Sequence, residues 1–290
     1  GFGYSTDVNF ETLKMKALDG YTLSGRRYSG QVVCGRIVLA GATGVPQGFY
    51  RYFAEAAVSR GFEVITFDYR GIGESAPKSL RGFEMNYLDW AQLDLAGVLH
   101  ALGSDKGIHL LGHSFGGQTL GVLPDLTSVI SLHTFATGAG WHGWMPKSEQ
   151  VRVKILWNIA GPIVTRSKGY LAWKKLGLGE DLPIGVYREW KHWCKFPNYW
   201  FDDPKLNHQM RDSFARVRAP ITAFNAIDDR WASPRSRDAF MNHYVNADLK
   251  LIDIDPGEFN LKAIGHMGYF RRGSEELWNR VFEDLEKLNA

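Results

Sequence analysis

Cysteine is scarce in this chain of 290 residues, and long hydrophobic runs are absent. The two cysteines, Cys34 and Cys194, exclude a small fold held together by several disulfides and favour reduced thiols in a cytoplasmic protein. No stretch approaches the ~18 uninterrupted apolar residues that a membrane span needs. The first residues also lack the basic and then apolar segments of a secretory signal. We therefore predict a cytoplasmic protein without a membrane-spanning helix.

A strong charge of one sign and the common cofactor motifs are lacking as well. The formal net charge is +3, and the basic residues are scattered, which argues against a nucleic-acid partner. There is no zinc-ligand spacing, no Walker motif and no Gly-x-Gly-x-x-Gly between a strand and a helix. We therefore predict neither a metal nor an organic cofactor, and we leave the oligomeric state open.

What the chain does contain is an alternation of strand-like and helical patterns. Residues 11–29 alternate around the turn signal Asp19-Gly20, which predicts an antiparallel edge hairpin. Buried strands are expected at 36–40, 62–67, 107–111, 128–132, 221–226 and 249–252, and helices at 49–59, 87–102, 235–246 and 274–288, with another helix beginning within 116–123. This order predicts an α/β fold, a mostly parallel, doubly wound sheet with helices on both faces.

One segment departs from this alternation. Residues 140–217 show no clear strand and hold seven of the ten tryptophans. We interpret the segment as a helical cap inserted into the core. The chain then divides into residues 1–139, the cap at 140–217, and residues 218–290, with the first and last parts forming one core. Specificity is expected to come from the cap and from the loops at the strand ends.

A short glycine-rich motif marks the candidate nucleophile. Residues 112–116 read Gly-His-Ser-Phe-Gly, which fits Gly-x-Ser-x-Gly between an apolar strand and a helix start. In such a turn the serine is strained and its Oγ is exposed at the edge of the sheet. The chain reverses so tightly that small residues are needed on both sides, which explains Gly112 and Gly116. Ser114 is therefore the candidate nucleophile.

Four segments together resemble the α/β-hydrolase superfamily. They are residues 68–75 (Asp-Tyr-Arg-Gly-Ile-Gly-Glu-Ser), 112–117 (Gly-His-Ser-Phe-Gly-Gly), 228–230 (Asp-Asp-Arg) and 264–266 (Ile-Gly-His). Segments 42–47, 189–194 and 264–271 further resemble a bacterial subgroup of α/β-hydrolases near the serine aminopeptidase-like and monoglyceride-lipase-like members. The resemblance spans nearly the whole chain and implies a Ser-His-Asp triad, but it says little about the substrate. It gives Asp68 and Arg70 structural roles.

The candidate base is His266, the last histidine, because it follows the last strand and precedes the terminal helix. The acid is expected after the strand at 221–226, where Asp228 and Asp229 are adjacent. Its carboxylate accepts the imidazole N–H and stabilises the imidazolium. Peptidases of the prolyl oligopeptidase type resemble the Asp-Asp-Arg stretch and use its first aspartate, whereas lipase-like relatives imply the second. We favour Asp229 and keep Asp228 as the alternative.

An oxyanion hole needs backbone N–H groups aimed at the developing charge. One is expected from Phe115, directly after the serine. The other is expected from the loop after the strand at 36–40. Many relatives carry a His-Gly pair there and this chain does not, so both Ala42 and Thr43 are candidates for the second donor. We favour Thr43 and keep Ala42 as the alternative.

For substrate binding we name four residues by their position in the sequence. His113 stands beside the nucleophile, and Trp141, Trp144 and Trp193 belong to the aromatic cap. Their rings would suit an acyl chain or an aromatic group.

These residues predict a serine hydrolase that cleaves a carboxylic ester, thioester or lactone through a serine acyl-enzyme, with a small-molecule ester or acyl compound as its partner. Two alternatives stay open. An aminopeptidase or amidase with the same triad would hold the free ammonium of its substrate with a carboxylate from the cap. A non-catalytic binding protein of the same fold would leave the triad unused.

Overall fold

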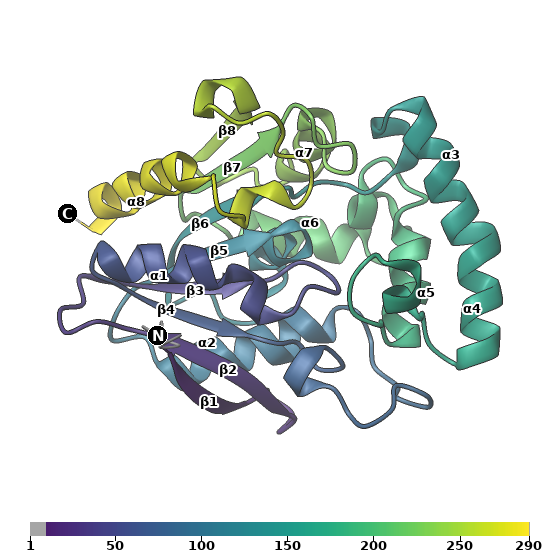
Figure 1. The fold of residues 1–290 in the computed structure, drawn as a ribbon, viewed down its shortest axis with the longest axis horizontal. Helices are drawn as coiled ribbons and strands as arrows, with labels where there is room; N and C mark the ends of the chain where they lie inside the picture. Colours follow the sequence, from purple (N-terminus) through teal and green to yellow (C-terminus); the bar gives the residue numbers. More distant parts are fainter. Residues whose placement is uncertain (1–9, 290) are drawn as a thin grey trace, which may run out of the picture.

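The computed structural model describes residues 10–289, apart from the side chain of Leu176, and contains an eight-stranded sheet (Figure 1). The strands lie in the order β1-β2-β4-β3-β5-β6-β7-β8. Their bounds are β1 (Glu11–Lys16), β2 (Thr22–Tyr28), β3 (Gly35–Ala40), β4 (Phe62–Phe67), β5 (Ile108–His113), β6 (Val129–Phe135), β7 (Ile221–Ala226) and β8 (Leu249–Ile254). Each predicted strand is present, so the prediction of an α/β sheet is confirmed.

The first two strands form the antiparallel edge that the Asp19-Gly20 turn predicts. β1 pairs antiparallel with β2, which pairs antiparallel with β4. Gly20 adopts a φ of 90°, which glycine reaches without steric cost. The pairs from β4 to β8 are all parallel. β4 and β5 are buried at every residue, as expected for parallel strands that are covered on both faces.

Helices cover both faces of the sheet. The side chains of β3 alternate between two buried clusters, with Ile37 and Leu39 in one and Val38 in the other. On the face of Ile37 lie α1 (Arg51–Ser59) and α8 (Glu275–Asn289), in front of the sheet in Figure 1. On the other face lie α2 (Ala96–Leu102), α6 (Asn207–Ala215) and α7 (Pro234–Met241). Among residues 10–289, no helix is long and apolar enough to cross a membrane.

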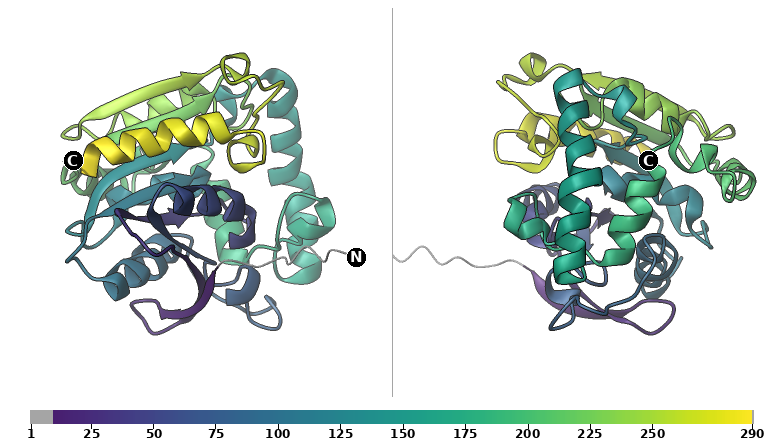
Figure 2. Two further views of the ribbon diagram at one scale, coloured as in Figure 1. Left: turned by 60° about the vertical axis from the view of Figure 1, so that its left-hand side comes forward. Right: turned by 90° about the vertical axis from the view of Figure 1, so that its right-hand side faces the viewer.

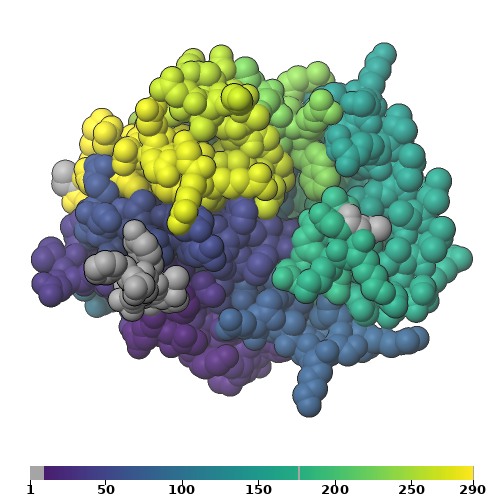
Figure 3. All heavy atoms as spheres, viewed as in Figure 1, coloured from purple at the N-terminus to yellow at the C-terminus, as the bar shows by residue number. Residues whose placement is uncertain are grey.

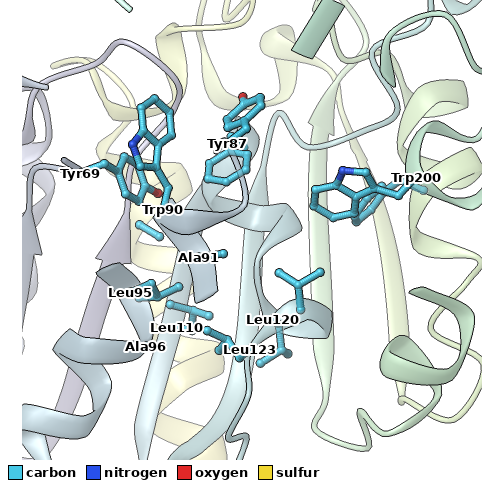
Figure 4. Packing of buried hydrophobic residues seen from close by; sticks show 14 of the residues in the cluster. Tyr69, Tyr87, Trp90, Ala91, Leu95, Ala96, Leu110, Leu120, Leu123 and Trp200 are labelled. Carbon is cyan, nitrogen blue, oxygen red and sulfur yellow. The ribbon is translucent and has the colours of Figure 1, made fainter. Parts of the chain in front are cut away.

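The cluster on the α2 side holds the 68–75 turn in place. In Figure 4, Tyr69 and Trp90 lie side by side at one end of this cluster, and their rings stack with centroids 4.8 Å apart. The indole N–H of Trp90 donates to the carbonyl of Arg70, whose buried guanidinium donates to Asp94 at 2.8 Å. The Asp68 carboxylate is also buried and accepts from the backbone amide of Glu74, within its own turn, and from that of Gln47, in the 3₁₀ turn after β3. These contacts give Asp68 and Arg70 the structural roles that the resemblance implies.

The segment 140–217 is helical, as predicted, and lies at the carboxyl ends of the parallel strands (Figure 1). Its helices α3 (Lys147–Ile155), α4 (Gly161–Lys168) and α5 (Ile184–Trp193) form one end of the molecule in the space-filling view of Figure 3. A π-helical turn, Leu156–Ala160, joins α3 to α4. Among the described residues of this segment, the only pairing of extended chain is one isolated bridge, between Leu171 and Leu182.

The last helix of this segment, α6, packs against α7, a helix of the layer that covers the sheet. Phe214 of α6 lies 5.6 Å from Phe240 of α7 and 4.6 Å from Tyr244, measured between ring centroids. α6 therefore belongs to the layer that covers the sheet, and the chain returns to the core before Asn207. The division at 139/140 and 217/218 stays a prediction.

The prediction that a helix begins within residues 116–123 is wrong. Two short 3₁₀ turns, Ser114–Gln118 and Leu120–Val122, stand in its place. Gly116, Gly117 and Gly121 lie so close to neighbouring chain that an added Cβ atom would overlap it. Glycine at these positions permits the close approach but weakens a helix, and Pro124 follows directly.

Candidate active site

Ser114 follows the last residue of β5 and has a φ of 54°, a left-handed conformation that a non-glycine residue adopts only under strain. The strain is held by the surroundings. A Cβ on Gly116 would overlap the carbonyl of Ala40, so the turn is pressed against the end of β3. The Thr137 hydroxyl donates to the carbonyl of Ser114 at 2.7 Å. The sharp turn predicted around the serine is therefore present.

His266 lies between the serine and a buried carboxylate. Its Nε2 is 3.1 Å from the Ser114 Oγ, and its Nδ1 is 3.1 Å and 3.2 Å from the two oxygens of Asp229. Because a carboxylate only accepts, the Nδ1 atom carries the proton and the Nε2 lone pair faces the hydroxyl. Asp229 is only 2% exposed. The three side chains thus form one hydrogen-bonded row.

Further donors fix the Asp229 carboxylate. The amides of Trp231 and Ala232 donate to Oδ1 at 3.0 Å and 2.9 Å, and the Tyr269 hydroxyl donates to Oδ2 at 3.1 Å. Burial raises the pKa of Tyr269 well above its ordinary value, so this phenol keeps its proton. These three donors hold the Asp229 carboxylate in one orientation toward the His266 ring.

Asp228, the alternative acid, has a different position. Its carboxylate accepts from the amides of Ile264 and Gly265 at 2.9 Å and 3.1 Å. These residues directly precede His266, so the hydrogen bonds to Asp228 fix the position of the loop that carries the His266 imidazole. The structure brings Asp229, and not Asp228, to the His266 ring.

The two candidates for the second oxyanion donor, Ala42 and Thr43, differ in whether the amide already has an acceptor. The Ala42 amide already donates to the Tyr50 hydroxyl at 2.8 Å. Within residues 10–289 the Thr43 amide has no acceptor, and Thr43 lines the cavity beside Ser114. The Phe115 amide belongs to the first turn after the serine, where helical amides lack acceptors within the turn. This geometry favours Thr43 over Ala42.

His113 is sealed beneath the site and does not line its cavity. It is fully buried, its Nδ1 lies 2.8 Å from the Tyr50 hydroxyl, and its Nε2 lies 2.9 Å from the carbonyl of His266. Burial, and in second place the neighbouring His266, lowers the pKa of His113 to about 3. The contacts expected of a substrate-binding residue are therefore absent from this side chain.

A mostly apolar cavity lies between Ser114 and residues of the helical segment 140–217, with a volume of about 60 Å³. The residues that line it are Thr43, Tyr87, Ser114, Phe115, Gln118, Ala136, Gly138, Gly140, Met145, Val153, Leu156, Trp157, Trp190, Cys194, Tyr199, Trp231, Ala232 and His266. Thr43, Ser114, Gln118 and His266 are polar lining residues, and aromatic and aliphatic side chains from both the core and residues 140–217 form most of the remaining wall. Typical ligand pockets hold about 300–1,000 Å³, so a sizeable ligand requires the wall to move.

The tryptophans in this wall are not those that the sequence suggested. Trp193 is buried and stacks on Tyr87, while the Trp144 indole donates to the carbonyl of Pro197 and packs against Trp141. None of these three tryptophans lines the cavity. Trp157 from the π-helical turn and Trp190 from α5 line it instead.

Trp231 is a further lining residue that sequence reasoning missed. Its ring centroid lies 5.6 Å from that of His266, and its indole N–H donates to the buried carboxylate of Glu149 at 2.8 Å. Trp231 therefore joins the loop that carries Asp229 to α3. Its place directly after Asp228-Asp229-Arg230 was the only available sequence signal.

Comparison with known proteins identifies the family. The sequence profile described as the alpha/beta hydrolase family matches residues 37–271, and the chain belongs to this family. No curated protein sequence gives a significant match.

Several solved structures share the fold at low sequence identity. A soluble variant of monoglyceride lipase from Saccharomyces cerevisiae, in complex with a substrate analogue, has a TM-score of 0.68 at 13% identity and covers 99% of each chain. DcsB in complex with its substrate analogue gives 0.67 at 17% identity, covering 96% of this chain and 99% of its own. An esterase from Pyrococcus furiosus gives 0.63 at 15% identity, covering 96% and 91%.

Proposed function

We propose that this protein is a serine hydrolase of carboxylic esters, thioesters or lactones. The observation that carries the proposal is the row of hydrogen bonds from Ser114 through His266 to the buried Asp229. A serine hydroxyl is a weak nucleophile by itself, and this arrangement places a base against it and a carboxylate behind the base. The fold shared with solved esterases and a monoglyceride lipase supports the same class of reaction.

In the proposed reaction, the His266 Nε2 takes the proton of the Ser114 hydroxyl while Oγ attacks the carbonyl carbon of the ester. The carbonyl oxygen becomes an oxyanion, which the amides of Phe115 and Thr43 stabilise. Collapse of this intermediate breaks the bond to the leaving alkoxide, which receives the proton from His266. Water then attacks the acyl-serine with His266 again as base, releasing the acid and restoring the serine.

Asp229 stabilises the imidazolium during both steps and keeps the ring in the reactive tautomer. Its fixed orientation, set by the amides of Trp231 and Ala232, means that little reorganisation is needed when His266 becomes charged. We propose residues 140–217 as the cap insertion, of which the part before α6 places an acyl group over Ser114.

The cavity wall favours an ester over the substrate of an aminopeptidase. Among the described residues that line it there is no aspartate or glutamate. A free substrate ammonium would therefore be desolvated without a partner, which is costly. The aliphatic and aromatic wall instead suits an acyl chain, because burying apolar surface is favourable.

A panel of p-nitrophenyl esters with acyl chains of two to twelve carbons tests this proposal, beside an aminoacyl p-nitroanilide. We expect turnover of esters with an optimum at one chain length, and loss of activity by roughly 10³-fold or more in Ser114→Ala at an unchanged melting temperature. Faster turnover of the anilide would contradict ester specificity. Full ester activity in Ser114→Ala would contradict the mechanism.

A further inference from the structure

The cap carries a row of large aliphatic side chains that point away from the protein. α3, the π-helical turn and α4 form one helical segment over residues 147–168. Val151, Ile155, Ile159 and Ile163 recur on it at every fourth residue and are 59%, 48%, 57% and 65% exposed. We call these four residues the outer row. Exposed single apolar residues are common, but a contiguous row marks an interaction surface.

The opposite side of the same segment faces the protein. Val153, Trp157, Gly161 and Thr165 are buried there, again four residues apart. A surface helix ordinarily has one apolar face and one polar face. This segment is apolar on both sides, although it lies outermost and faces the viewer in the right-hand view of Figure 2. Packing onto the core therefore accounts for only one of its two faces.

The π-helical turn reduces the winding of the outer row around the helix axis. In an α-helix, every fourth residue is rotated by about 40° beyond a full turn, so a row of four would wind around the axis. Leu156–Ala160 forms a π turn, which rotates less per residue and offsets part of this drift between Ile155 and Ile159. π turns are frequent at functional sites.

Positive charges flank the outer row at both ends. Lys147, Arg152 and Lys154 lie near its start, and Arg166 and Lys168 follow its end. The acidic group between residues 147 and 168 is Glu149, whose buried carboxylate accepts from the Trp231 indole and pairs with Arg152 at 3.3 Å. Arg152 is therefore neutralised, and the net positive charge of the segment comes from Lys147, Lys154, Arg166 and Lys168. Residues 155–165 carry no charge. This is the pattern of a helix that lies in the plane of an anionic lipid interface.

A groove beside the outer row leads toward the cavity. Its volume is about 310 Å³, and it is lined by Glu149, Arg152, Val153, Ile155, Leu156, Ala160, Leu178 and Trp231. Val153, Leu156 and Trp231 line both the groove and the cavity beside Ser114. These three side chains therefore contribute to the wall between the larger outer space and the smaller inner one.

We propose that the outer row docks the cap onto an anionic lipid surface, and that the groove then receives the acyl chain of an ester held in that surface. The docking stands independently of catalysis, whereas the delivery of the ester rests on the proposed function. A second copy of the chain is a poorer occupant of this face. It would bring two rows with basic residues at both ends into contact, which is electrostatically unfavourable.

Co-sedimentation with vesicles tests the docking directly, and it needs no turnover. We expect the protein to bind vesicles of phosphatidylcholine with 30% phosphatidylglycerol, to bind pure phosphatidylcholine far less, and to be released by high salt. The double variant Ile159→Ser/Ile163→Ser should lower partitioning by roughly tenfold or more. The matched control is Val32→Ser/Val245→Ser, which replaces two valines that are 77% and 69% exposed elsewhere, and it should bind like the wild type.

Ester hydrolysis and analytical ultracentrifugation distinguish docking onto lipid from dimer formation and from failure of the proposed function. With a soluble short-chain p-nitrophenyl ester, Ile159→Ser/Ile163→Ser should match the wild type, while with an ester embedded in the anionic vesicles it should be slower. Absence of vesicle binding by the wild type overturns the docking, and equal binding of the double variant and its control does so too. A wild-type dimer in analytical ultracentrifugation that the double variant dissociates would assign the face to a second copy. Failure of ester hydrolysis with intact vesicle binding would overturn the proposed function alone.

Discussion

The Nε2 atom of His113 lies 2.9 Å from the backbone carbonyl of His266. A carbonyl only accepts, so Nε2 carries the proton and the Nδ1 of His113 accepts from the Tyr50 hydroxyl. The oxygen of that hydroxyl in turn accepts from the Ala42 amide. One buried chain of hydrogen bonds therefore joins the loop of the proposed oxyanion donor to the loop of the proposed base.

Removing the middle of this chain is expected to disturb both loops. Tyr50→Phe leaves the Ala42 amide and the His113 Nδ1 without a partner, which costs about 1–3 kcal/mol for a buried group. We expect a lower melting temperature and a fall in kcat of roughly 10-fold, with KM little changed, because the donor to the oxyanion is displaced. The control is Tyr52→Phe, whose hydroxyl contacts the exposed Arg51 guanidinium. Equal kinetics in the two variants would contradict this role.

The depressed pKa of His113 predicts a pH-dependent stability. It is about 3 in the folded protein and ~6.5 in an unfolded chain. Between these values the unfolded chain binds the extra proton, so stability rises with pH and is lost as the pH falls below ~6.5, by up to about 1.4 kcal/mol per pH unit. His113→Asn should be less stable at pH 7.5 and should lose stability less steeply toward pH 5. Urea unfolding across this range measures both slopes, and parallel curves would contradict the prediction.

The two adjacent aspartates should separate in their kinetic effects. Asp229→Asn offers an amide N–H to the His266 Nδ1 and favours the unreactive tautomer, so kcat should fall by roughly 10³–10⁴-fold. Asp228→Asn retains one oxygen for the amides of Ile264 and Gly265, and we expect a loss of about tenfold with a lower melting temperature. Steady-state kinetics on one p-nitrophenyl ester compares them. A larger loss for Asp228→Asn would reverse the assignment.

Chain-length selectivity should depend on Trp190 and not on Trp141. Both indoles are half-buried, but only Trp190 lines the cavity. Trp190→Ala should move the optimum of the ester panel toward longer acyl chains, and each methylene newly accommodated is worth roughly tenfold or more in kcat/KM. Trp141→Ala should leave the optimum in place. The same shift in both variants would mean that the cap responds as a whole.

Much of this architecture was predictable because it depends on local rules. Parallel strands that are buried on both faces appear as continuous apolar runs, and Ser114 was detectable because its turn requires small neighbours at Gly112 and Gly116. The positions of His266 and the aspartate pair followed from strand ends, since loops at one edge of a parallel sheet converge. The choice between Asp228 and Asp229 was not local, because one residue of loop geometry decides which carboxylate reaches the ring.

The cavity wall was beyond prediction for a physical reason. Trp190 and Trp193 lie three residues apart on α5, and only the packing of that helix decides which indole faces Ser114. The π-helical turn before α4 changes the direction in which the Trp157 side chain points around the helix axis, and the amino-acid composition of the segment does not predict such a turn. The wrong prediction of a helix at 116–123 has a similar cause. Residue 121 must be glycine because the Phe214 ring, far away in the sequence, leaves no space for a Cβ atom there.

The most direct test of the central claim is covalent labelling of the serine. The wild-type protein is treated with a fluorophosphonate, which reacts with an activated serine, and its intact mass is measured beside Ser114→Ala and His266→Ala. The account predicts one adduct per chain that maps to Ser114, none in Ser114→Ala, and labelling slowed by orders of magnitude in His266→Ala. An unlabelled wild-type protein, or an adduct that persists in Ser114→Ala, would contradict it.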